Sequence, residues 1–112
     1  MTQLFHRNLV IIESPYAGEV ETNVEYARKA VKDSLSRGEW PLASHLLYTQ
    51  SGILDDNQPD ERRLGIRAGL EWRRVAHRAV FYTGRGWSVG MVEARKIYDA
   101  EGFPYELRFM NP

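Results

Sequence analysis

The chain has 112 residues, 43% of them hydrophobic and 27% charged, which suffices for one globular domain over residues 1–112 and excludes a second catalytic domain. Its 15 basic and 15 acidic residues cancel, which argues against a general nucleic-acid or anionic-membrane binder, because such binding requires an excess of Lys and Arg. The sequence contains no Cys, so disulfides, thiolate metal sites and thiol nucleophiles are excluded.

The first predicted element is a strand in the segment NLVIIES, residues 8–14. Its continuous β-branched run is typical of a strand buried on both faces of a parallel sheet, and Ser14-Pro15 ends it. The apolar run has only four residues, Leu9 to Ile12, which is too short for a signal peptide or a membrane span. We therefore expect a cytoplasmic protein.

A helix is predicted from Asn23 until Gly38 ends it. Apolar residues recur there every three to four positions, and charged residues fill the other face. A short strand follows in the segment EWPLAS, residues 39–44. Its Pro41 has no amide donor, which favours the start of a strand or an edge position, and its end leads to His45. The apolar positions of the helix are Val24, Ala27, Val31 and Leu35.

The segment HLLYTQSGILDDNQPDERR, residues 45–63, has no periodicity and predicts a long loop beside a functional site. A second helix is expected from about Asp60, with Asp60 as its N-cap. Its predicted apolar face consists of Leu64, Ala68, Trp72, Val75 and Ala76. The same region carries a basic cluster, which indicates a solvated face or a subunit interface. The cluster contains Arg62, Arg63, Arg67, Arg73, Arg74 and Arg78.

The segment RAVFYT, residues 78–83, predicts a third strand, and YELRFM, residues 105–110, a fourth. Between them we expect a helix capped by Ser88 that runs to about Ala100, where Gly102 and Pro104 stop it. Strands and helices thus alternate along the whole chain. This order predicts an α/β fold, a three-layer Rossmann-like (flavodoxin-like) parallel sheet of four to five strands with helices on both faces.

Ligands of such sheets bind outside the carboxyl ends of the strands, where the strand order reverses, so the loops after the first three strands are expected to converge. Glu93 would lie in the second turn of the third helix, facing inward with Ile97 and Ala100. The helix N-terminus favours its ionised form, whereas apolar neighbours disfavour it. Such a dry but charged carboxylate suits a nucleophile or an electrostatic stabiliser. The alternative is a surface Glu paired with Lys96.

Three further motifs have competing interpretations. The segment SPYAG, residues 14–18, suits a sugar or phosphate site, or is simply a turn with Tyr16 packed against it. The segment GRGWSVG, residues 84–90, could hold an anion at a helix N-terminus, but its spacing and position do not fit a dinucleotide fingerprint. The histidines His6, His45 and His77 lack metal-ligand spacing, so we expect no metal and no cofactor.

The segments VIIESPYAGEVETNVEYARKAV, GEWPLASHLLYTQ and WSVGMVEARKIYDAEG together resemble the nucleoside 2-deoxyribosyltransferase-like superfamily, including its small phage- and prophage-type members. The resemblance implies that a glutamate attacks the anomeric carbon of a nucleoside or nucleoside 5′-monophosphate, and that water or a second base resolves the glycosyl-enzyme. It implies catalytic roles for Glu93 and Tyr16. It also implies that Ser88 and Gly90 hold the sugar or the 5′-phosphate. The further candidates for substrate binding in the same crevice are Ser14, Gly18, His45, Gly86 and Met91, with a structural role as the alternative for His45.

The resemblance further implies an aspartate that helps to protonate the leaving base, but the comparable stretch, residues 68–84, contains no Asp. Glu71, Asp55 or Asp56 is expected to substitute for it. Sites in this superfamily are commonly shared between subunits, which implies a homodimer or larger assembly in which Asn111 reaches into a neighbour.

We therefore expect cleavage of an N-glycosidic bond by a hydrolase or a deoxyribosyltransferase. The hydrolase is slightly favoured, because a chain of this length has little material for a second base pocket. The alternatives are a non-catalytic protein that sequesters a nucleotide or nucleotide-derived signal, and an interaction module whose crevice is vestigial.

Overall fold

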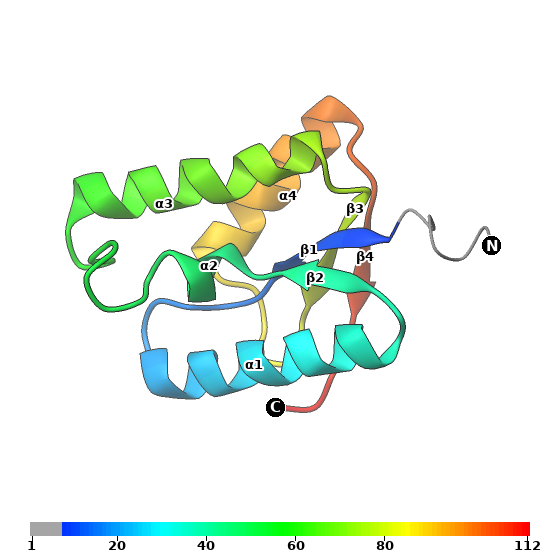
Figure 1. Cartoon of the computed structure of the whole chain (residues 1–112), viewed down its shortest axis with the longest axis horizontal. Coiled ribbons are helices and arrows are strands. Elements are labelled where there is room, and N and C mark those ends of the chain that lie inside the picture. The colour runs from blue at the N-terminus through cyan, green and yellow to red at the C-terminus, as the bar shows by residue number, and fades with distance from the viewer. Residues whose placement is uncertain (1–7) are drawn as a thin grey trace.

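The computed structural model describes residues 8–112, which form a parallel four-stranded sheet between two layers of helix (Figure 1). The strands are β1 (Leu9–Glu13), β2 (Trp40–Leu42), β3 (Arg78–Tyr82) and β4 (Tyr105–Arg108), in the order β2-β1-β3-β4. The predicted three-layer Rossmann-like fold is confirmed, with four strands. Pro41 lies in the edge strand β2, as its missing amide donor required. His6 lies outside the described residues.

The two central strands divide the hydrophobic core into two halves because successive side chains of a strand point to opposite faces. On one face, Val10 and Ile12 of β1 pack under α1 (Val20–Ser36). On the other face, Ile11 packs under α4 (Val89–Glu101). The β3 residues divide in the same way, with Val80 and Tyr82 in the first half and Ala79 and Phe81 in the second.

The ends of α4 agree with the sequence. Ser88 is the N-cap, and its hydroxyl accepts a hydrogen bond from the Met91 amide at 3.2 Å. Gly102 is the C-cap in the left-handed conformation, with φ at 69°. Among residues 8–112, no helix has the length and apolar character needed to cross a membrane.

The predicted faces of the other two helices are partly wrong. Helix α1 begins at Val20, before the predicted start, and Leu35 is exposed rather than buried. The N-cap of helix α3 (Pro59–Glu71) is Gln58 instead of Asp60. Leu64, which was expected on its buried apolar face, is exposed. The cause is tertiary packing, which overrides a weak periodicity.

Helix α3 packs through a glycine. A Cβ added to Gly69 would lie 2.3 Å from the Ser44 hydroxyl of the short helix α2 (Ser44–Leu47). Only a residue without a side chain permits this approach. The helix therefore buries Gly69 and half-buries Leu70, and it is followed by the 3₁₀ turn Trp72–Arg74.

A cluster of charged side chains is buried between α1 and the sheet. The buried Arg108 guanidinium lies 2.9 Å from the Glu39 carboxylate, and Arg78 lies 2.7 Å from the same group. The Ser34 hydroxyl donates a further hydrogen bond to Glu39 at 2.7 Å. Hydrogen bonding to Arg108, together with Ser34 and Arg78, lowers the pKa of Glu39 to about 2 against the opposing effect of burial. Glu39 is thus a buried carboxylate that stays ionised.

Replacing Glu39 by Gln should lower the unfolding free energy by about 3–5 kcal/mol, because it removes the buried ionic partner of Arg108 and leaves that guanidinium only more exposed carboxylates. Glu106 provides the matched control. It contacts the same two arginines but its side chain is 45% exposed, against 5% for Glu39. Glu106→Gln should therefore cost about 1 kcal/mol or less. Urea unfolding measures both, and equal losses would contradict the assignment of Glu39 as the buried ionic centre.

Candidate functional site

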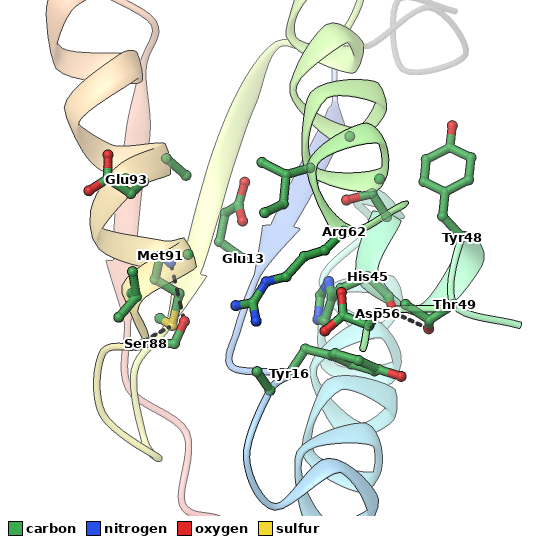
Figure 2. A pocket seen from close by; sticks show the side chains of 18 of the residues that line it. Glu13, Tyr16, His45, Tyr48, Thr49, Asp56, Arg62, Ser88, Met91 and Glu93 are labelled. Atoms are coloured by element: carbon green, nitrogen blue, oxygen red, sulfur yellow. Dashed lines mark hydrogen bonds between the residues drawn. The ribbon is translucent and has the colours of Figure 1, made fainter. Parts of the chain in front are cut away.

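A cavity of about 530 Å³ opens at the carboxyl ends of β1 and β3, where the strand order reverses (Figure 2). The loops after β1, β2 and β3 all contribute to it, and α3 closes one side. The predicted convergence of the three loops is therefore confirmed. Its volume lies within the range of small-molecule sites. Among the predicted site residues, the lining includes Ser14, Tyr16, Gly18, His45, Asp56, Ser88, Gly90, Met91 and Glu93.

Four of the predicted residues do not line this cavity: Gly86, Glu71, Asp55 and Asn111. Gly86 does not line the cavity; its φ of 85° serves the turn that leads from β3 to α4. Glu71 is bound by Arg73 and Arg74 at the far end of α3, so it cannot substitute for the missing acid. Asp55 lines a neighbouring cavity, where its carboxylate accepts a hydrogen bond from the Asn57 amide at 2.9 Å.

Asn111 does not line the cavity of its own chain. The C-terminal segment instead passes beside α1, where the Tyr26 hydroxyl donates to the Met110 carbonyl at 2.9 Å. A contribution of Asn111 to a neighbouring subunit stays a prediction.

His45 and Ser14 form a polar pair on the wall of the cavity. The Ser14 hydroxyl lies 2.7 Å from His45 Nε2, and the Tyr16 ring packs edge-on against the imidazole at 6.5 Å between centroids. Burial lowers the pKa of His45 to about 4, so the imidazole is neutral at physiological pH. A neutral imidazole beside a hydroxyl can exchange hydrogen bonds with a polar ligand, but it supplies no positive charge.

The loop that carries Tyr16 is held in place by the buried Asn23 of α1. The Asn23 amide donates to the carbonyls of Tyr16 and Ala17, at 3.0 and 3.1 Å. Its carbonyl oxygen accepts a hydrogen bond from Arg85, in the loop after β3, at 2.8 Å. Arg85 also pairs with Glu19. Asn23 therefore ties two of the loops around the cavity together, a role that its place in a helix did not indicate.

Glu13, the last residue of β1, is a cavity residue that the sequence analysis missed. It shares the strand face of Ile11, so it points toward α4, where the Tyr98 hydroxyl donates to its carboxyl at 2.5 Å. Burial raises the pKa of Glu13 to about 7, although the hydrogen bond from Tyr98 lowers it. Its accessible surface opens onto the cavity. The alternation of side chains along LVIIE could have revealed it, because position 13 shares a face with position 11.

Glu93 lies at the edge of the cavity in a more exposed position than expected. Its side chain is 59% exposed, and its carboxylate lies 3.6 Å from the Lys96 ammonium. Figure 2 shows it pointing away from Glu13. The expected dry environment is therefore wrong for the single chain, and the alternative of a pair with Lys96 is confirmed. The inward face of α4 consists of Met91, Ala94 and Tyr98 instead.

Arg62 also differs from expectation. It was assigned to a solvated face or subunit interface, but it is half-buried and lines the cavity. In Figure 2 its side chain extends from α3 into the space between Glu13 and His45.

The environment of Glu13 predicts a specific pH dependence of stability. Because its folded-state pKa of about 7 exceeds the ordinary value of 4.5, the folded state retains a proton that the unfolded state loses. The stability present below about pH 4.5 should therefore decline as the pH rises to about 7. The Gln in Glu13→Gln can still accept the hydrogen bond from Tyr98 but does not titrate. The unfolding free energy of this variant, minus that of the wild type, should therefore increase by about 3 kcal/mol between pH 4.5 and pH 7. Urea unfolding of both proteins at a series of pH values measures this change. A difference in unfolding free energy that is the same at every pH would contradict the raised pKa of Glu13.

Comparison with known proteins gives one finding on the family. Residues 8–108 match the model of a family described as a domain of unknown function, DUF7768. No curated protein matches the sequence. Since the match covers both central strands, the cavity loops and α4, the chain belongs to the DUF7768 family.

Proposed function

We propose that the protein is a cytoplasmic enzyme that cleaves the N-glycosidic bond of a nucleoside or nucleoside 5′-monophosphate, as a hydrolase or deoxyribosyltransferase. One observation carries the proposal: a single cavity contains two carboxyl groups in opposite environments. Glu93 is exposed to solvent, whereas Glu13 is half-buried and has its pKa raised to about 7. Such a pair separates the roles of nucleophile and acid, as in retaining glycosidases. The resemblance of the three cavity segments to the nucleoside 2-deoxyribosyltransferase-like superfamily supplies the substrate class.

In the proposed first step, the Glu93 carboxylate attacks the anomeric carbon while the bond from that carbon to the base nitrogen breaks. The protonated Glu13 gives its proton to the departing base. In the second step, water or an acceptor base attacks the glycosyl carbon, its proton passes to Glu13, and Glu93 is released. The hydrogen bond that Tyr98 donates to one Glu13 oxygen leaves the other oxygen for this proton. Glu13 thus takes the role first considered for Glu71, Asp55 or Asp56.

The proposal includes a homodimer or larger assembly. Apolar side chains are exposed to water at the start of α4 and just before it, close to Glu93 in the sequence. Val89 is 74% exposed, and Trp87 and Val92 are also exposed. A second copy placed over this strip would remove water from Glu93 and favour a side-chain position over the cavity. Asn111 of that copy is the residue proposed to reach the site.

A second candidate function is a non-catalytic protein that sequesters a nucleotide. The pairing of Glu93 with Lys96 favours it, because the carboxylate then points away from the cavity. Calorimetric titration with nucleotides, beside an assay for released base, separates the two functions: both bind, but only the enzyme turns over.

Incubation with a panel of nucleosides and 5′-monophosphates, followed by chromatography for free base, tests the reaction. Glu93→Gln should reduce turnover by at least about a thousandfold and leave substrate affinity within about tenfold, because the nucleophile acts in the transition state. Glu101→Gln is the matched control, since Glu101 lies on the same helix, pairs with Arg73 and does not line the cavity. Its turnover should match the wild type. Normal turnover by Glu93→Gln would rule out this mechanism.

The proposed acid predicts the pH profile of the reaction. Since Glu13 must be protonated to release the base, kcat/KM should fall as the pH rises above about 7. Glu13→Gln should lower kcat/KM and remove this decline, because an amide does not titrate. For substrates whose base leaves without needing a proton, Glu13→Gln should lower kcat/KM less. A decline that persists in Glu13→Gln would assign the acid to another group, with Asp56 at the cavity rim as the next to test.

A further inference from the structure

Arg62 is a charged residue without a charged or hydrogen-bonding partner for its side chain among the described residues. Neither a hydrogen bond nor an ion pair connects its guanidinium to residues 8–112, although it is half-buried and lines the cavity. It is also the one Arg or Lys in the described lining of that cavity. A guanidinium has five donors in a planar fork, and leaving them unmatched in a partly dry site costs free energy.

The other arginines near α3 show how unusual this is. Arg63 pairs with Asp60 one turn away, and Arg73 pairs with Glu101 of α4. Arg67 also has no partner among the described residues, but it is exposed, so water can satisfy its donors. Arg62 combines the missing partner of Arg67 with a position inside a cavity.

The carboxyl groups around the cavity do not satisfy Arg62. Glu13 is bound by Tyr98 and is largely protonated below about pH 7, and Glu93 pairs with Lys96. Glu61 accepts a hydrogen bond from the Asp55 amide at 3.0 Å. Asp56 lines the cavity but forms no ion pair with Arg62. A cation held among carboxyl groups that do not pair with it remains available to an anion from outside.

We propose that Arg62 binds the phosphate monoester of the substrate, so that the enzyme acts on nucleoside monophosphates in preference to nucleosides. This inference rests on the proposed function for the identity of the nucleoside, but the anion site itself does not depend on catalysis. The planar guanidinium matches the oxygens of a phosphate through two parallel hydrogen bonds. The cavity, about 530 Å³, has room for a base, a sugar and one phosphate. Specificity for the phosphate then comes from α3, on the side of the cavity opposite α4.

Calorimetry with ligands that cannot react tests the anion site independently of turnover. Ribose 5-phosphate has the phosphate but no glycosidic base, and it should bind the wild type, whereas ribose should bind at least about tenfold more weakly. Arg62→Gln should lose roughly tenfold to a hundredfold in affinity for ribose 5-phosphate, as expected for a hydrogen bond to a charged group. Its affinity for ribose should not change. Arg62→Lys should lose less, and Arg67→Gln, the same change on the same helix outside the cavity, should lose nothing.

The same variants are then assayed for base release. For the wild type, kcat/KM should be higher for a nucleoside monophosphate than for its nucleoside, and Arg62→Gln should remove this preference. Equal loss for both substrates would overturn the inference, as would ribose 5-phosphate binding that is absent or unchanged in Arg62→Gln. If no base is released but ribose 5-phosphate binding depends on Arg62, the proposed reaction fails and the phosphate site stands. Circular dichroism of each variant confirms that a loss of binding is not a loss of fold.

Discussion

The parallel pairing of β1 with β3 is the contact on which the rest of the molecule depends. Two apolar strands that are distant in sequence lie side by side at the centre of the sheet, from Val10 beside Arg78 to Glu13 beside Phe81. The chain then continues to opposite edges, to β2 on one side and β4 on the other. The loops that leave these two strands must separate, and the cavity lies in the gap between them.

The surroundings of two glutamates at the sheet shift their pKa values in opposite directions. Glu39 is buried between two arginines that keep its pKa near 2, so it remains charged and joins α1 to the sheet. Desolvation raises the pKa of the half-buried Glu13 to about 7, although the Tyr98 hydroxyl donates a hydrogen bond to its carboxyl group. Burial alone therefore does not decide the charge of a carboxyl group; the number of donors around it does. The first group serves stability, and the second is available for chemistry.

The two sides of the cavity also differ in whether their charged side chains are paired. On the α4 side, Glu93 is paired with Lys96, whereas on the α3 side Arg62 has no hydrogen-bonding or ionic partner among residues 8–112. An unbalanced charge persists in a folded protein when something outside the chain can satisfy it. This asymmetry supports the proposed binding of a ligand with a negative group.

The sequence by itself determined the order of the elements, because runs such as LVII, the caps Ser88 and Gly102, and Pro41 express local backbone and burial preferences. It also indicated which loops meet, because parallel strands bring their carboxyl ends to one edge. It could not set the rotation of α4, where apolar residues occur on almost every face, so Glu93 was placed inward in error. It also missed Glu13, Asn23 and Arg62, whose surroundings come from elements up to 85 residues away. Only tertiary packing decided whether each of these groups is dry, paired or free, because desolvation and charge depend on neighbours in space.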